Sequence, residues 1–132
     1  MHITSIYEDH YLGATYRAGI AYLRARAPGD DRAPRRTGTY PLDQQRTIIA
    51  HAARVQQTII VTEIIEYGDR AKGFRPAFRQ LGAFMCETHA PYLFVARDEY
   101  LAWRAEDHAL LTRYLADADI TLIPAYDRWK SK

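Results

Sequence analysis

Thiols and imidazoles are too few or too scattered in this sequence to build a disulfide framework or a metal site. Its 132 residues include one cysteine, Cys86, which falls within an apolar helical pattern and is predicted to be a core residue. The five histidines are scattered, and no two of them have the spacing of metal ligands. We therefore expect no disulfide, no metal ion and no other cofactor.

Long apolar runs are missing as well. No segment approaches the length of a membrane span, and the N-terminus lacks the charged-then-apolar pattern of a signal peptide. We expect a cytoplasmic protein without a membrane partner. The formal net charge of +2 is too small to indicate DNA binding by itself.

Serine is scarce, and the glycine motifs that bind phosphate are absent. The only serines are Ser5 and Ser131. Neither a Gly-x-Gly-x-x-Gly pattern nor a P-loop follows the first apolar run, which argues against a dinucleotide or nucleoside triphosphate site. A receiver-type phosphorylation domain would place carboxylates at the strand ends, where this sequence has arginines instead.

Strand and helix patterns alternate along the chain. Apolar and β-branched runs predict strands over 20–26, 58–65, 92–96 and 120–123, the last ending at Pro124. Apolar stripes predict helices over 42–57, over 76–90 and around 110–118. Such alternation is typical of right-handed crossover connections between parallel strands. We predict an α/β fold in three layers, with a mostly parallel sheet of four to five strands between helices.

The chain has the length of one domain. Residues 1–18 contain several aromatics but no sustained period, and they could form an N-terminal arm or a short helix packed on the domain. Residues 19–126 carry the alternating pattern of the α/β domain. Residues 127–132 are predicted to form a C-terminal tail.

Arginine gathers where the first predicted strand ends. Arg24 and Arg26 close that strand, and the following stretch, 27–40, adds three arginines but contains no serine, cysteine or histidine. In open α/β sheets, ligands bind at the carboxyl ends of the strands. Guanidinium groups match phosphate oxygens with two parallel hydrogen bonds. The pattern therefore predicts a phosphate or other anion site and argues against ordinary nucleophilic catalysis.

Five short motifs follow one another in an order that matches a known family. They are Tyr22-Leu23-Arg24-Ala25-Arg26, Leu42-Asp43-Gln44-Gln45, the segment 66–73, Arg75-Pro76-Ala77-Phe78, and Leu93-Phe94-Val95 leading into Asp98. From Ile20 to about Tyr126, the chain resembles the catalytic domain of serine recombinases of the resolvase/invertase family. The resemblance implies a resolvase-like fold, a bacterial or phage source and a role in DNA recombination.

The family's chemistry is a metal-free transesterification, in which a serine attacks a DNA phosphodiester and several arginines stabilise the developing charge. The family's first motif is tyrosine, any residue, arginine, any residue, serine. Tyr22 and Arg24 match it, but Arg26 stands at the position of the serine. Gln45 matches the family's glutamine in the first helix, and Arg75 matches the arginine of its arginine-proline step.

The sequence departs from the family at further positions. Glu66 stands where the family has an aspartate, and Arg70 where it has a second serine. Asp98 fits the start of the family's later block, but glutamate and alanine replace the two arginines that should follow it, and Arg104 is two residues out of register. Both serines lie outside the core that carries the motifs, so no residue can act as the usual nucleophile.

These matches and departures together predict a recombinase-like domain that has lost strand cleavage and acts as an accessory or regulatory protein. Its partners would be the DNA backbone, another recombinase subunit or a second copy of itself. The long dimerisation helix and the DNA-binding module that continue the family's chains do not follow Tyr126 in this sequence. The candidate phosphate-binding residues are Arg24, Arg26, Gln45, Arg70 and Arg75.

Two alternatives remain open at the level of sequence. The domain could be a protein-interaction module that kept only the scaffold and has no role with DNA. It could also be an active recombinase or nuclease whose nucleophile has moved to Thr37, Thr39 or Tyr40 in the arginine-rich stretch.

Overall fold

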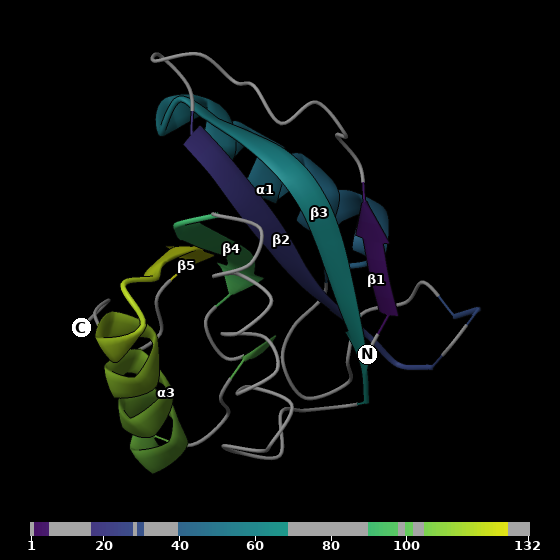
Figure 1. The fold of residues 1–132 in the computed structure, drawn as a ribbon. Helices are drawn as coiled ribbons and strands as arrows, with labels where there is room; N and C mark the ends of the chain where they lie inside the picture. The colour runs from purple at the N-terminus through teal and green to yellow at the C-terminus, as the bar shows by residue number, and fades with distance from the viewer. Residues whose placement is uncertain are drawn as a thin grey trace.

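Five strands form one mixed sheet with a helix on each side (Figure 1). The computed structural model of the protein describes residues 2–5, 17–27, 29–30, 40–68, 90–97, 100–101 and 105–126. The strands are β1 (His2–Ser5), β2 (Arg17–Ala25), β3 (Thr58–Tyr67), β4 (Tyr92–Arg97) and β5 (Thr121–Tyr126). The helices are α1 (Leu42–Val55) and α3 (Ala105–Asp117).

The order of the strands across the sheet is β1-β3-β2-β4-β5. Strands β2, β3, β4 and β5 are parallel to their neighbours, and only β1 runs antiparallel, against β3. Strand β2 lies in the centre and pairs with both β3 and β4. Helix α1 follows β2 in the chain and forms the crossover to the parallel strand β3. The predicted α/β fold with a mostly parallel sheet is confirmed.

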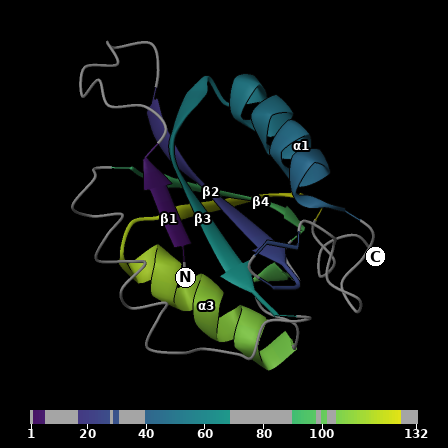
Figure 2. The ribbon, with the colours of Figure 1, turned by 90° about the vertical axis from the view of Figure 1, so that its right-hand side faces the viewer.

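The core has two halves because side chains alternate along β2. Ile20 and Tyr22 belong to the half that packs on α3, together with Leu111 and Leu115 of that helix. Leu23 belongs to the half that packs on α1. Figure 2 shows α1 and α3 on opposite sides of the sheet. Strand β2 is therefore buried on both faces, as its continuous apolar pattern predicts.

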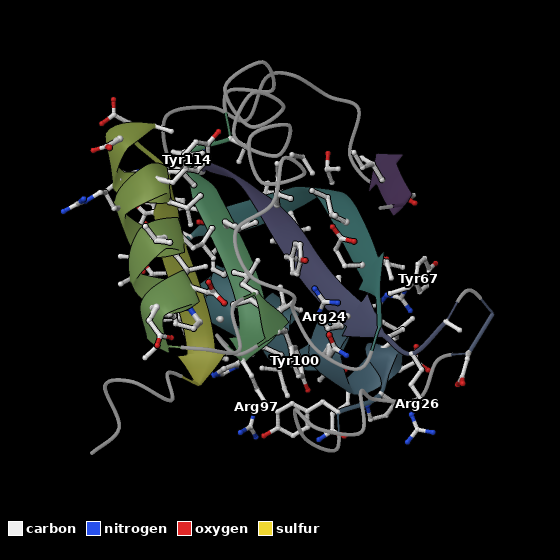
Figure 3. The ribbon with its side chains drawn as sticks, turned by 90° about the horizontal axis from the view of Figure 1, so that it is seen from below. Arg24, Arg26, Tyr67, Arg97, Tyr100 and Tyr114 are labelled. Carbon is white, nitrogen blue, oxygen red and sulfur yellow. The ribbon has the colours of Figure 1, made fainter. Side chains whose placement is uncertain are left out.

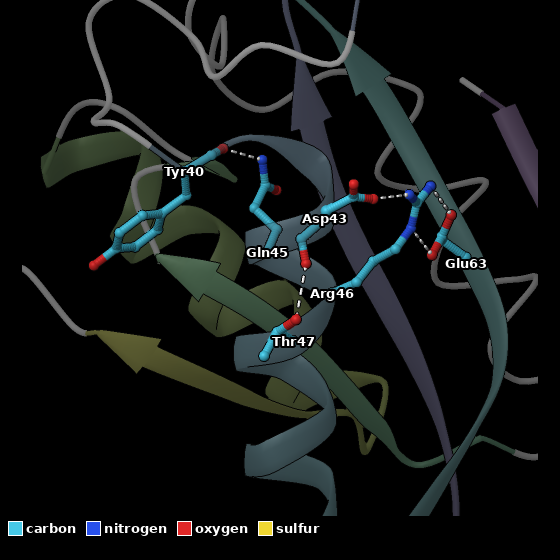
Figure 4. A network of polar contacts seen from close by, with 6 residues as sticks. All are labelled: Tyr40, Asp43, Gln45, Arg46, Thr47 and Glu63. Atoms are coloured by element: carbon cyan, nitrogen blue, oxygen red, sulfur yellow. Dashed lines mark hydrogen bonds and ion pairs between the residues drawn. The ribbon is translucent and has the colours of Figure 1, made fainter.

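Helix α1 is joined to the sheet by an ion pair at its first turn. The Arg46 guanidinium donates Nε to Oε2 and Nη2 to Oε1 of Glu63 on β3, both at 2.9 Å, and also lies 3.3 Å from Oδ1 of Asp43 (Figure 4). The hydrogen bond to Glu63 raises the pKa of Arg46, against the opposing effect of burial. A group whose pKa is raised by folding stabilises the folded state at every pH below its unfolded-state pKa. That stabilisation is lost only as the pH rises through the folded-state pKa, so the pair between Arg46 and Glu63 persists at neutral pH. Since the Arg46 side chain is 42% exposed, the pair contributes at most about 1 kcal/mol.

Several strand boundaries differ from those predicted, among them the end of β3, which lies at Tyr67, two residues later than expected. Strand β2 begins at Arg17, three residues earlier than expected, and ends at Ala25, so Arg26 lies just beyond it. Residues 2–5 form an edge strand, which a segment without a clear period did not indicate. Strand β5 runs through Pro124 to Tyr126, although the sequence placed its end at that proline. An edge strand tolerates proline because one side of it has no neighbour that needs the missing N–H.

The helices agree with the predicted stripes in position but not in length. Helix α1 ends two residues before Gln57, and α3 begins at Ala105, five residues before the first leucine of its stripe. The helix predicted over 76–90, together with Cys86, lies outside the described residues. Neither described helix is long and apolar enough to cross a membrane.

Both helices are followed by a residue with a left-handed backbone that is not glycine. The φ angle is 51° at Gln57, after α1, and 58° at Asp119, after α3. Glycine usually occupies this position after a helix, because a Cβ there costs about 1 kcal/mol. These two positions therefore carry a local strain that the sheet and helix packing offset.

Replacing Gln57 by glycine is expected to stabilise the protein by up to about 1 kcal/mol, because it removes the strained Cβ contact. The matched control is Gln56→Gly, since Gln56 has φ −89° and gains nothing from glycine. That control should lose about 0.5 kcal/mol through the greater freedom of the unfolded chain. Urea unfolding of both variants checks this. Equal destabilisation by the two substitutions would contradict the left-handed backbone at Gln57.

Candidate functional site at the carboxyl edge of the sheet

The parallel strands end together at one edge of the sheet, which we call the carboxyl edge. Arg24 and Ala25 end β2, Glu66 and Tyr67 end β3, and Arg97 ends β4. Figure 3 shows this edge at its lower side, with Arg97 and Arg26 at the rim and Arg24 further inside. Of the described arginines, Arg26 and Arg97 therefore lie at the ends of adjacent strands.

Arg24 is an internal residue, with only 1% of its surface exposed. Its Nε donates a 2.8 Å hydrogen bond to the carbonyl oxygen of Tyr100, and its Nη2 donates to the hydroxyl of Tyr22 at 3.1 Å. A buried guanidinium needs such acceptors because losing its hydration without them costs several kcal/mol. Arg24 thus binds protein groups in this arrangement and ties β2 to the segment that follows β4.

Gln45 holds the same stretch of β2 from α1. The side chain is fully buried, its Oε1 accepts from the backbone N–H of Arg24 at 3.1 Å, and its Nε2 donates to the Arg24 carbonyl at 2.8 Å. Nε2 also donates to the carbonyl of Tyr40 at 2.8 Å (Figure 4). Both N–H donors of the amide are used in this way. Gln45 is therefore a clamp between β2 and the start of α1, and contact with a phosphate would require one of these bonds to break.

Tyr22 and Glu66 surround the Arg24 side chain on the α3 side of the sheet. Tyr22 lies two residues before Arg24 on β2 and is fully buried. Glu66 is 7% exposed and is the direct β3 partner of Arg24 in the register of the sheet. Partners in adjacent strands have their side chains on the same face, so a buried carboxylate and a buried guanidinium share this region. The register of β2 and β3 thus places one positive and one negative side chain, Arg24 and Glu66, at the same level of the interior.

Arg26 is placed differently from Arg24. It lies one residue beyond β2, is half-buried, and in Figure 3 extends away from the position of Arg24. After it the chain turns: Ala27 and Asp30 form an isolated bridge, and Gly29 has φ 81°. The amide of Asp30 donates to the carbonyl of Ala27 at 3.0 Å. Arg26 therefore lies between the end of β2 and a tight turn.

The structure adds residues to the carboxyl edge that the motifs did not indicate. Arg97 is the last residue of β4, and its guanidinium carbon lies 5.6 Å from the centre of the Tyr40 ring. Tyr100 supplies the carbonyl that accepts from Arg24. Arg97 could have been found from the sequence, because a cation directly after a buried strand of a parallel sheet lies at the carboxyl edge. Nothing in the sequence points to the carbonyl of Tyr100.

Several predicted site residues lie outside the described part of the chain: Arg70, Arg75, Asp98, Thr37 and Thr39. Of the candidate set, the structure therefore places six residues: Tyr22, Arg24, Arg26, Tyr40, Gln45 and Glu66. It brings Tyr22, Arg24 and Gln45 into one hydrogen-bonded network and leaves Arg26 at the rim.

Ser5 is remote from this network. It pairs with Thr62 on β3, five residues before Tyr67, which is the partner of Ala25. Five residues along a strand span about 16 Å, and β3 stands between β1 and β2. Ser131 lies outside the described residues.

A cavity of about 430 Å³ lies elsewhere, between α3 and β5. His108 and Leu115 of α3 and Pro124 of β5 are among its lining residues, and the arginines of the carboxyl edge are not. Within the described ranges, no three side chains of histidine, cysteine, aspartate or glutamate are grouped as a metal site would need. The cavity is therefore separate from the arginines of the carboxyl edge.

No family model matches this sequence, and neither does any curated protein. Solved structures do share its fold. The N-terminal catalytic domain of TP901-1 integrase aligns with a TM-score of 0.64 at 16% identity, over 83% of this chain and 78% of that domain.

The catalytic domains of two IS607-like serine recombinases also share the fold of this chain. The C-terminal catalytic domain of ISC1926 TnpA has a TM-score of 0.59 at 9% identity, over 84% of this chain and 72% of that one. That of IS1535 TnpA has a TM-score of 0.56 at 19% identity, over 83% and 71%. The chain has the fold of serine recombinase catalytic domains. The recombinase-like fold predicted from the motifs is thereby confirmed, at levels of identity that concern the fold alone.

Within this recombinase-like domain, Arg24→Lys is expected to lower the free energy of unfolding by about 2–4 kcal/mol. A lysine keeps the charge but cannot reproduce the planar fork that reaches both Tyr100 and Tyr22. Arg54→Lys is the control, since Arg54 is exposed in the last turn of α1 and should change stability by less than about 0.5 kcal/mol. Thermal and urea unfolding measure both. Wild-type stability of Arg24→Lys would refute the internal role of this guanidinium.

Proposed function

We propose that this protein is a serine recombinase-like domain that binds the DNA backbone without cleaving it and serves as an accessory or regulatory subunit. The partner it would act on is a recombinase subunit or a second copy of the chain. The observation that carries the proposal is Arg26, which stands directly after β2 at the position of the family's serine.

The loss of cleavage follows from the chemistry of that position. Transesterification needs an oxygen or sulfur nucleophile beside a group that can take its proton. A guanidinium stays protonated at any physiological pH and has no lone pair to offer. Ser5, on the distant edge strand β1, cannot replace the missing serine without dismantling the sheet.

Backbone binding is supported by the cations at the rim. Arg26 and Arg97 lie at the tips of adjacent strands, where guanidinium groups suit the tetrahedral oxygens of phosphodiesters. Arg24 and Gln45 would support this surface from inside, since their hydrogen bonds fix the backbone that ends in Arg26. Arg70 and Arg75 remain predicted phosphate contacts by their match to the family motifs. The solved relatives in fold are named as serine recombinases and an integrase, proteins of the class for which DNA is the substrate.

One observation favours the alternative of a working enzyme. Tyr40 lies beside the Arg97 guanidinium, so a hydroxyl-bearing side chain and a cation share the carboxyl edge. A tyrosine so placed could attack a phosphodiester, as Thr37 or Thr39 could in the same stretch. The proposal and this alternative differ in whether a covalent protein–DNA adduct forms.

Incubation with supercoiled plasmid separates the two. We expect binding without nicking, relaxation or a covalent adduct, with or without added Mg²⁺, because Arg26 stands where the family motif has its serine. If an adduct forms, Tyr40→Phe, Thr37→Val and Thr39→Val identify its nucleophile, and the inactive reading is wrong.

Titration of a duplex oligonucleotide at rising salt tests the binding itself. Contacts to phosphates predict an affinity that falls steeply and linearly on a plot of log affinity against log salt. Arg26→Ala should weaken binding and lower the slope by about one. Absence of any binding at low salt would leave a protein-interaction module as the function.

A further inference from the structure

Arg97 is a cation of the carboxyl edge to which no motif assigns a role. It ends β4, the neighbour of β2, and the two strands are paired as far as Tyr22 and Val95. Two residues beyond that pair, Arg24 and Arg97 reach the same level of the sheet, since both strands continue in parallel. Arg97 is half-buried, whereas Arg24 at that level is enclosed.

The aromatic ring of Tyr40 fixes where the Arg97 guanidinium lies. The distance of 5.6 Å from the guanidinium carbon to the ring centre is within the range of a cation–π interaction. Such a contact restricts the rotamers of Arg97, because it favours side-chain conformations that keep the guanidinium over the ring. An arginine held in this way loses less conformational entropy when it binds an anion than one on a freely rotating side chain.

Tyr40 is itself held in place by the Gln45 clamp. The Tyr40 carbonyl accepts from Nε2 of Gln45 at 2.8 Å, and the same amide is bonded to the backbone of Arg24 (Figure 4). Pro41, which follows, has φ −65° and caps α1. One amide thus joins the backbone of Tyr40 to the backbone of β2, two residues before Arg26.

We propose that Arg97, supported by Tyr40, is a second contact for the phosphodiester backbone beside Arg26, with Gln45 as the positioning residue of the pair. The inference rests on the proposed DNA-binding function. Arg26 and Arg97 leave adjacent parallel strands, whose axes are about 4.8 Å apart. The same network of hydrogen bonds holds the segments that carry Arg26 and Tyr40. The two arginines can therefore bind a DNA backbone with little rearrangement of the protein.

The experiment is a salt titration of a fluorescent duplex oligonucleotide with the full chain and six variants, Arg26→Ala among them. Arg97→Ala is expected to weaken binding about 5–10-fold at low salt and to lower the slope of log affinity against log salt by about one. Arg97→Lys keeps the charge, so the slope should be retained while affinity falls about two- to threefold through loss of the planar fork. Arg97→Lys also decides the question if the alanine variant does not fold.

The supporting role of Tyr40 has its own readout. Tyr40→Leu removes the ring and should weaken binding about threefold with an unchanged slope, since the number of cations is the same. Tyr40→Phe keeps the ring and should restore the affinity lost in Tyr40→Leu. Arg54→Ala is the control for a cation outside the site, because Arg54 lies at the opposite end of α1, about 20 Å along the helix.

Two results would overturn the proposal in distinguishable ways. If the wild-type chain binds DNA and Arg26→Ala weakens it, but Arg97→Ala matches the wild type in affinity and slope, Arg97 is not a contact and the proposed function stands. If the wild-type chain shows no binding at low salt, the proposed function fails and the role of Arg97 fails with it. A loss in Arg54→Ala equal to that in Arg97→Ala would show diffuse attraction and no localised contact.

Discussion

The end of β2 is held by hydrogen bonds from both sides of the sheet, and the arrangement of the carboxyl edge depends on them. Arg24 is enclosed in the half of the core next to α3, so its guanidinium must find acceptors there, and it finds them in the Tyr100 carbonyl and the Tyr22 hydroxyl. From the other side, the Gln45 amide engages the N–H and the carbonyl of the same residue. The strand that leads to Arg26 is thereby fixed to α1, to β4 and to the segment after β4.

This network separates the arginines of the edge by their surroundings. Arg24 is enclosed and satisfied by protein groups, whereas Arg26 and Arg97 lie at the rim. A guanidinium with internal partners contributes to the framework, and one at the rim can meet a phosphate without first giving up its place in the core. The proposed contact with the DNA backbone therefore rests on Arg26 and Arg97, and the internal Arg24 has a structural role.

The sequence was sufficient to predict the central sheet, and less so its margins. Strands such as β3 are rich in β-branched residues, so their local sequence predicts a strand whichever neighbour they pair with. β1 is four residues long and forms part of the sheet only because β3 offers it a free edge, which no local pattern reports. Pro124 misled the prediction of β5, since the tolerance of an edge strand for proline depends on its place in the sheet. The position of Arg97 after a buried strand already marked it as a residue of the carboxyl edge, but its contact with Tyr40 depends on the tertiary structure.

By itself, the sequence determined the alternation of strands and helices, the arginines that gather at the end of the first strand, and the scarcity of serine in the motif-bearing core. These are properties of residue identity and order, which the chain carries whatever its conformation. Only the tertiary structure decided which arginine is internal and what Gln45 binds. The physical reason is that the acceptors are largely backbone carbonyls from distant segments, as in the bond between Arg24 and Tyr100 across 76 residues. Every residue has such a carbonyl, so nothing in the sequence marks the one that the fold brings within reach.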